Sequence, residues 1–190
     1  MIGILYRLDK ELFYLINGSL GNPVFDLIMP WFRYMYFWFP LYAFLIAYIV
    51  YRYKKKSIYP LLMIALTVTV SDQLSGNFIK KSVQRIRPCN NEMMQEYVVK
   101  RVPCGSGFSF TSAHASNHFA LAVIMIFLFA AQYRWVKWAA PLWAASVAFA
   151  QVYVGVHFPA DVTVGAILGS LIAYGFLMLF KNSLTPDKTE

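Results

Sequence analysis

Long apolar segments separated by short polar ones set the pattern of this chain. The long apolar segments have about the length that a helix needs to cross a bilayer. They cover residues 35–52, 58–79, 116–133, 137–155 and 162–181. A shorter apolar stretch, 24–31, is either a partial insertion or the start of the first span. The pattern therefore predicts an all-α integral membrane helix bundle with about five to six transmembrane helices.

The first 20 residues follow a different pattern. Charged side chains at positions 7 and 9–11 lie among leucines and isoleucines, without the continuous apolar run or small-residue cleavage site of a signal peptide. Such an amphipathic segment predicts a helix lying in the membrane interface. We expect one membrane-embedded domain over residues 1–182, followed by a flexible tail at 183–190.

Composition supports a lipid environment. Hydrophobic residues make up 59% of the chain and charged residues 14%, against about 45–50% and about 25% in soluble domains. The net charge is +8, and the basic residues occur in short clusters. At this hydrophobicity, anionic headgroups or phosphorylated substrates are the expected partners, and nucleic acid is not.

Basic residues and cysteines together predict an orientation. The cluster at 52–56 is of the kind retained in the cytoplasm. Alternation of the spans then places segments 80–115 and 156–161 outside. Cys89 and Cys104 both lie in the first of these segments. They are either free thiols or, in an oxidising compartment, a disulfide worth roughly 3 kcal/mol.

Three polar clusters fall at the same predicted membrane face, at 80–88, 111–114 and 151–161. Ionisable residues at a membrane are costly and usually functional, although helix-end lysines and arginines also serve as headgroup anchors. His157 and Asp161 are four residues apart, so the carboxylate can fix the tautomer of the imidazole and leave the other nitrogen free to attack. Asp161 is also a candidate N-cap of the last span.

The second cluster places a histidine close to a helix start. Ser112, Ala113 and His114 follow a glycine-containing run at 105–107. Small residues before a helix expose backbone N–H groups that suit an anion. At the same face as the other clusters, His114 becomes a candidate general acid.

One alternative to this scheme is a metal site. His118 lies one helical turn beyond His114, and the two could join His157 and Asp161 as ligands. We favour the interpretation in which His118 is a supporting polar residue and the reaction needs no metal.

Motif order and spacing resemble those of the type 2 phosphatidic acid phosphatase superfamily. That family carries Lys-x6-Arg-Pro, then Pro-Ser-Gly-His, then Ser-Arg-x5-His-x3-Asp. The matching residues in this chain are Lys80, Arg87, Pro88, Ser112, His114, His157 and Asp161. The second motif matches only at serine and histidine, and the third begins with Ala150-Gln151 in place of Ser-Arg.

The resemblance implies roles for these positions. His157 would attack phosphorus and form a phosphohistidine, with Asp161 orienting it, while His114 would protonate the leaving oxygen and then activate water. The phosphate-binding residues that it implies are Lys80, Arg87, Ser112, Ala113 and Gln151. Neither a metal nor a cofactor is expected, so protein groups alone would stabilise the charged transition state.

Gln151 is the departure with the largest expected consequence. Glutamine keeps hydrogen-bonding capacity but lacks the charge of the family arginine, and losing one preorganised donor can cost about 2.7–4 kcal/mol. Lys81 and Arg85 are candidates for compensation, although Arg85 is expected on a different helix face from Arg87. The alternatives are therefore hydrolysis, phosphoryl transfer to another acceptor, and lipid-phosphate binding with weakened hydrolysis.

The implied substrate is a lipid phosphate or pyrophosphate. The family suggests undecaprenyl pyrophosphate, phosphatidylglycerol phosphate, phosphatidic acid and lipid A phosphates, of which we place undecaprenyl pyrophosphate first. We expect a multi-pass protein of the cytoplasmic (inner) membrane with its active site on the extracytoplasmic, periplasmic side. The sequence leaves the oligomeric state open.

Overall fold

The computed structural model describes residues 2–184, and every regular element in that range is helical. The predicted all-α class is therefore confirmed. The α-helices are α1 Ile2–Tyr14, α2 Pro23–Phe32, α3 Phe39–Tyr53, α4 Ile58–Asp72, α5 Lys80–Val83, α6 Ala113–Phe129, α7 Val136–Tyr153 and α8 Pro159–Phe180. A π-helical stretch, Gln73–Ile79, connects α4 to α5 without a break.

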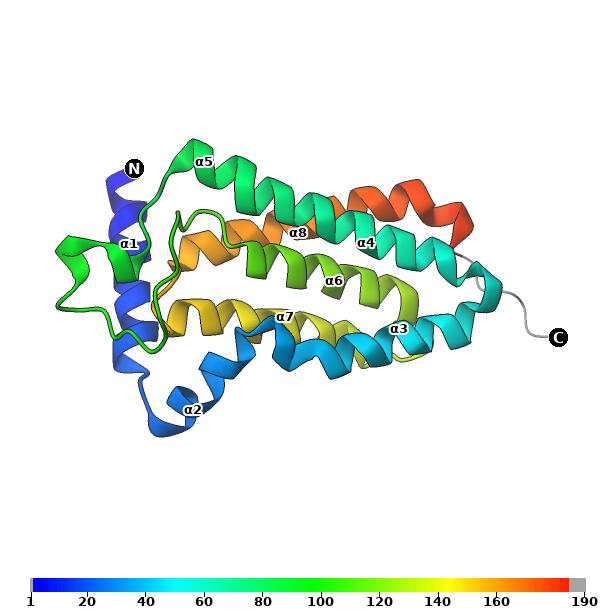
Figure 1. Cartoon of the computed structure of the whole chain (residues 1–190), viewed down its shortest axis with the longest axis horizontal. Helices are drawn as coiled ribbons and strands as arrows, with labels where there is room; N and C mark the ends of the chain where they lie inside the picture. The colour runs from blue at the N-terminus through cyan, green and yellow to red at the C-terminus, as the bar shows by residue number, and fades with distance from the viewer. Residues whose placement is uncertain (1, 185–190) are drawn as a thin grey trace.

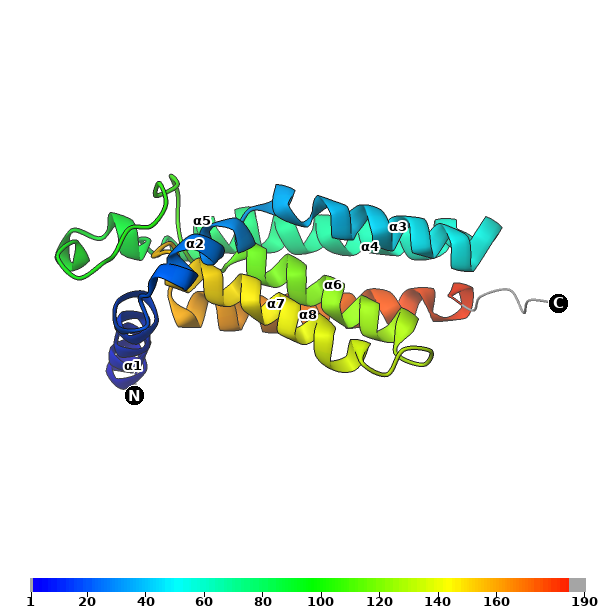
Figure 2. The same ribbon diagram turned by 90° about the horizontal axis from the view of Figure 1, so that it is seen from below.

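The long helices lie side by side along the molecule, and α1 crosses one end of the bundle (Figure 1). Figure 2 shows α3 and α4 as one layer over a second layer of α6, α7 and α8. Within the second layer, α6 packs against both α7 and α8. The N-terminal ends of α6 and α8 and the C-terminal end of α7 meet near α1, so the loops at this end converge.

The contact between α6 and α8 is close enough to require glycine. A Cβ atom at Gly169 would collide with the carbonyl of Ser116, and one at Gly165 would lie 2.6 Å from the carbonyl oxygen of Ser112. The spacing of these glycines is the small-residue pattern that lets helix backbones approach in membranes. The same contact lets the Ser112 N–H donate to the Asp161 carbonyl at 3.0 Å. The first turns of α6 and α8 are thus held together.

Two helical stretches of the described residues are long and apolar enough to cross a membrane, Met35–Val83 and Pro159–Ser183. The first folds back at Lys54–Ser57, so that α3 and α4 run in opposite directions (Figure 1). The predicted number of five to six transmembrane helices is not confirmed by this criterion. The helix positions nevertheless follow the apolar pattern to within a few residues.

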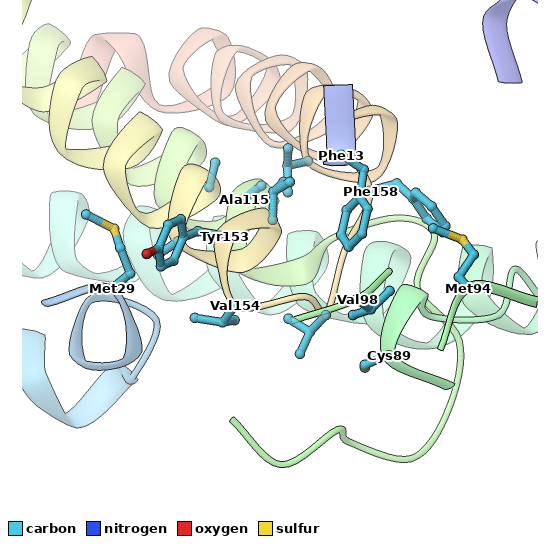
Figure 3. Close-up of a cluster of buried hydrophobic side chains, with 14 residues drawn as sticks. Phe13, Met29, Cys89, Met94, Val98, Ala115, Tyr153, Val154 and Phe158 are labelled. Atoms are coloured by element: carbon cyan, nitrogen blue, oxygen red, sulfur yellow. The ribbon is translucent and has the colours of Figure 1, made fainter. Parts of the chain in front are cut away.

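A buried apolar cluster ties the converging loops to the bundle. Figure 3 shows Phe13 of α1 beside Phe158, with Cys89, Val98 and Tyr153 in the same cluster. Cys89 and Cys104 form a disulfide, with Cα atoms 5.9 Å apart.

The predicted tail falls mostly beyond the part of the chain that the structure describes. Ser183 ends a 3-10 turn, Lys181–Ser183, and Leu184 is buried against the bundle. Residues 185–190 lie outside the described residues, so the prediction for them stays a prediction.

Candidate active site

A tight turn after α7 presents His157. Gly155 has φ +89°, a conformation that residues with a Cβ rarely adopt. The backbone N–H groups of Val156 and His157 then both donate to the Gln151 carbonyl at 3.2 Å. The turn is therefore fixed by its own backbone, and His157 is 2% exposed.

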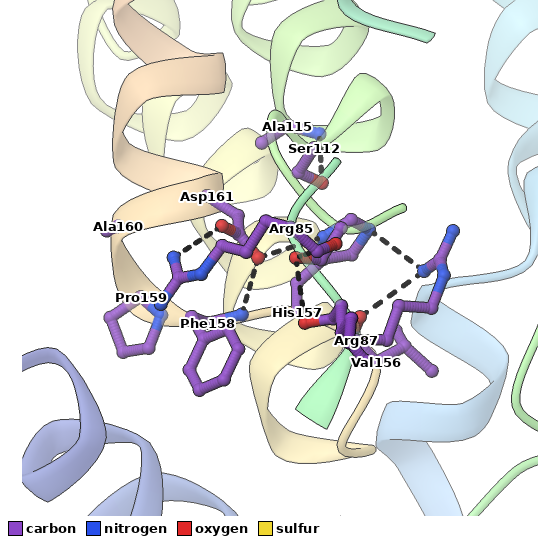
Figure 4. A network of polar contacts seen from close by, with 12 residues as sticks. Arg85, Arg87, Ser112, Ala115, Val156, His157, Phe158, Pro159, Ala160 and Asp161 are labelled. Atoms are coloured by element: carbon purple, nitrogen blue, oxygen red, sulfur yellow. Dashed lines mark hydrogen bonds and ion pairs between the residues drawn. The ribbon is translucent and has the colours of Figure 1, made fainter. Parts of the chain in front are cut away.

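The two ring nitrogens of His157 face different partners. Nδ1 lies 3.5 Å from Oδ2 of Asp161, and Nε2 lies 3.4 Å from Nη1 of Arg87 (Figure 4). A carboxylate at Nδ1 favours the tautomer with the proton there, which leaves the Nε2 lone pair available. The longer Nδ1 contact resembles catalytic hydrogen bonds without substrate, which tighten when substrate binds. The structure thus brings together the predicted His157, Asp161 and Arg87.

Burial keeps this imidazole neutral. It is the main cause that lowers the pKa of His157 to about 4, and it outweighs the opposing effect of Asp161. Because the pKa lies below the usual value of 6.5, the ring is uncharged at neutral pH, which a nucleophile requires.

Asp161 is the third residue of α8 and not its N-cap. The helix begins at Pro159, so Phe158 holds the N-cap position. The Asp161 carboxylate still caps the helix, since Oδ2 accepts the Phe158 N–H at 2.8 Å. Its other oxygen, Oδ1, accepts from Nη1 of Arg85 at 2.7 Å. Both oxygens of this buried carboxylate are therefore held in place (Figure 4).

Arg85 and Arg87 come after the end of α5, in a segment that is not helical, so they do not occupy two faces of a helix. The α5 helix ends at Val83, and Gln84 takes a left-handed conformation with φ 52°. Arg87 then turns toward His157 and donates from Nη1 to the Val156 carbonyl at 3.3 Å. The expectation of a helix at both arginines was wrong. Arg85 is bound to carboxylates and so is not a substitute for the missing family arginine.

Lysines complete the basic side of the site. Lys80, Lys81 and Arg87 line a cavity of about 300 Å³ together with the backbone of the glycine-containing run. Lys80 is the first residue of α5, the short helix that continues from α4. The cavity therefore presents three cationic side chains, of which Arg87 contacts His157.

The second predicted cluster opens α6 as expected. Ser112 is the N-cap, and its Oγ accepts the Ala115 N–H at 3.4 Å. His114, in the first turn, is half-buried and lines a larger cavity together with Ala113. The Ser112 N–H donates to the carbonyl of Asp161, whose side chain contacts His157, so the first turn of α6 that carries His114 begins beside the His157 site.

His118 makes contacts that stabilise α6. Its Nδ1 contacts the His114 carbonyl oxygen at 2.8 Å, and its Nε2 contacts the Tyr42 hydroxyl at 3.1 Å. Within residues 2–184, no three His, Cys, Asp or Glu side chains come together as a metal-binding group. The described geometry therefore gives the proposed metal ligand set no support.

Gln151 and Arg33 change the set of residues expected to bind phosphate. Gln151 is 1% exposed, and neither polar atom of its amide has a hydrogen-bond partner among the described residues. Arg33, at the C-terminal end of α2, was missed by sequence reasoning. Its buried Nε also lacks a partner in the described range. Burial first, and the positive charge of Arg33 second, lower the pKa of Arg87. The only signal of Arg33 in the sequence is a positive charge shortly after the short apolar stretch 24–31.

A larger cavity of about 700 Å³ begins at His114 and runs between α3, α4 and α6. Asp72, Asn117 and His118 are polar residues near its head. The apolar lining includes Leu45, Ile46, Ile49, Leu61, Ile64, Leu121 and Leu128. An apolar cavity with a few polar groups at one end suits an amphiphilic ligand.

The family model described as the PAP2 superfamily matches residues 58–184, which contain all three polar clusters. The chain belongs to the PAP2 superfamily. A lipid A 4'-phosphatase of Bacteroides thetaiotaomicron is 32% identical over 182 residues, covering 94% of this chain and 80% of that protein. The resemblance inferred from the motifs is thereby confirmed.

Two further comparisons extend the match. An undecaprenyl-diphosphatase of Sulfolobus acidocaldarius is 28% identical over 171 residues, covering 87% of this chain and 75% of that protein. The crystal structure of a transmembrane PAP2-type phosphatidylglycerolphosphate phosphatase from Bacillus subtilis superposes with a TM-score of 0.75 and 24% identity, covering 94% and 87% of the two chains. The protein is thus a membrane-associated phosphatase of the PAP2 family that acts on lipid phosphates.

Proposed function

We propose that the protein hydrolyses a phosphomonoester on a saccharide-headed lipid, lipid A 4'-phosphate, at the extracytoplasmic face of the cytoplasmic membrane. The observation that carries the chemistry is the placement of His157 between Asp161 and Arg87. The similarity to the Bacteroides lipid A 4'-phosphatase supports this substrate over undecaprenyl pyrophosphate, which the sequence alone placed first.

The proposed reaction has two phosphoryl transfers and needs no metal. Nε2 of His157 attacks phosphorus, and the bond from phosphorus to the ester oxygen breaks as His114 donates a proton to that oxygen. A water molecule then gives its proton to His114 and attacks phosphorus, which breaks the P–N bond and releases phosphate. Lys80 and Arg87 stabilise the charge on the phosphoryl oxygens in both steps.

Membrane placement is part of the same proposal. The 700 Å³ cavity would take a lipid tail while the phosphate reaches Lys80, Lys81 and Arg87. The disulfide of Cys89 and Cys104 supports an oxidising compartment for the loop that carries Arg87. The basic turn Lys54–Ser57 lies at the opposite end of the bundle from α1, as the positive-inside rule predicts for a cytoplasmic turn.

The substrate assignment is tested with purified protein in detergent, with a chelator present, on four substrates. These are lipid A, undecaprenyl pyrophosphate, phosphatidylglycerol phosphate and phosphatidic acid. We expect the fastest phosphate release from lipid A, and mass spectrometry of the product should show loss at the 4'-position. Faster release from undecaprenyl pyrophosphate would instead make this lipid the substrate, in line with the similarity to the Sulfolobus undecaprenyl-diphosphatase. Binding without release would favour the lipid-phosphate binding alternative that Gln151 suggests.

Arg33 is expected to supply the charge that Gln151 lacks. Replacing Arg33 by alanine should lower kcat/KM roughly 10-fold, because hydrogen bonds to charged groups contribute about 1.5–3 kcal/mol. The matched control is Arg134→Ala, which removes an exposed arginine from the loop between α6 and α7. Equal activity of the two variants would show that Arg33 has no part in binding phosphate.

A further inference from the structure

One stripe of α1 faces the protein while the rest of the helix is exposed. Asp9 and Phe13 of α1, and Asn17 of the π-helical turn Leu15–Ser19 that continues it, are spaced by four residues and are all buried, Asp9 being 8% exposed. The other side of the helix exposes apolar side chains, including those of Leu5, Leu8 and Leu12. The predicted interfacial helix is therefore also fastened along one edge to the bundle.

Each residue of the stripe contacts the segment around His157. Asn17 donates from Nδ2 to the Tyr153 carbonyl at 2.8 Å. The ring of Phe13 packs on that of Phe158, with centroids 5.4 Å apart (Figure 3). Asp9 accepts the backbone N–H of Ala160 through Oδ1 at 2.7 Å. These three contacts bracket the catalytic histidine on both sides.

Asp9 also reaches the catalytic carboxylate through Arg85. The guanidinium of Arg85 donates from Nη2 to Asp9 at 2.5 Å and from Nη1 to Asp161 at 2.7 Å. Its Cζ atom lies 3.8 Å from the centroid of the Phe158 ring. A guanidinium shared between two buried carboxylates is restricted in position by both. Asp9 therefore restricts where Arg85 can place Asp161.

We propose that Asp9 of α1 is a positioning residue for catalysis, acting through Arg85 on Asp161 and hence on the orientation of His157. This rests on the proposed function of the same site. It makes the N-terminal helix a part of the active site, although Asp9 touches no substrate. Removing its charge while keeping its shape should impair the orientation of the nucleophile more than substrate binding.

The test is Asp9→Asn, with Glu11→Gln as the matched control. Glu11 lies on the same helix but is exposed and paired with Arg7 at 3.6 Å. We expect Asp9→Asn to lower kcat roughly 10-fold with little change in KM, because a misoriented reacting group loses rate without losing substrate binding. The control should behave as wild type, and Asp9→Glu should recover part of the loss.

A double-mutant cycle separates positioning from general destabilisation. If Asp9 acts through Asp161, Asp9→Asn should reduce the residual activity of Asp161→Asn by no more than about 2-fold, because the two residues lie in one network. An equal loss in both backgrounds, or wild-type activity of Asp9→Asn, would overturn the proposal. An inactive wild type with every substrate would instead refute the proposed function.

A second readout does not depend on turnover. Nitrogen NMR of labelled histidine reports the tautomer of His157, assigned by comparison with His157→Ala. Asp9→Asn should increase the population with the proton on Nε2, and Glu11→Gln should not. Unchanged tautomer populations in Asp9→Asn would contradict the proposal even if no substrate were turned over.

Discussion

Replacement of His157 by alanine is expected to lower kcat by roughly 10⁴-fold or more, as found when a covalent nucleophile is removed from other hydrolases. The imidazole is the group whose free nitrogen lies beside Arg87, and the proposed covalent intermediate could not form without it. Labelled phosphate should attach to the wild-type protein after a rapid quench, as an acid-labile and base-stable adduct. His157→Ala should carry no such label.

The control for this variant is its folding and its binding of substrate. The midpoint of thermal unfolding should show a folded protein, and lipid A should still bind, since Lys80, Lys81 and Arg87 remain. A His157→Ala protein that releases phosphate within 10-fold of the wild-type rate would exclude a phosphohistidine at this position.

Replacement of His114 by alanine is expected to have the second largest effect, a loss of roughly 10²–10⁴-fold with a lipid phosphate. His114 would protonate a sugar oxygen, which is a poor leaving group. With p-nitrophenyl phosphate the leaving group needs no proton, so transfer to His157 should be much less affected. Water attack on the phosphohistidine would still lack its base. Stopped-flow absorbance should therefore show a burst of nitrophenol followed by slow turnover.

The same burst experiment can refute this role. An equal loss for both substrates, without a burst, would mean that His114 acts by binding phosphate or by holding the fold. His118→Ala is a useful comparison, because His118 is the next histidine on α6 and contacts Tyr42. It should slow both substrates alike, if at all.

Local patterns were sufficient to predict the helices and the residues that the structure brings together around His157. Apolar runs placed α3, α4, α6, α7 and α8 to within a few residues. Fixed spacing within each motif identified His157 with Asp161, and Lys80 with Arg87. These predictions depend on residues close in sequence, whose relative positions a helix or a tight turn determines.

Long-range contacts were not predictable in the same way. Arg85 meets Asp9 and Asp161 across 76 positions in each direction, and nothing in the local pattern indicates these partners. The left-handed turn at Gln84 also redirects the chain, so the assumed helix faces of the two arginines did not exist. The close approach of α6 and α8 did have a signal, because Gly165 and Gly169 are four apart in an apolar segment.

The histidines proposed to react and the far wall of the apolar cavity lie in different layers of the bundle. His114 and Asp161 stand on α6 and α8, where backbone contact leaves no room for a larger residue at Gly169. The far wall of the apolar cavity comes from α3 and α4, through side chains such as Ile49 and Leu61. Substitutions in that wall can change which lipid fits without moving the reacting groups. Such an arrangement allows related proteins to exchange substrates during evolution while the chemistry is inherited unchanged.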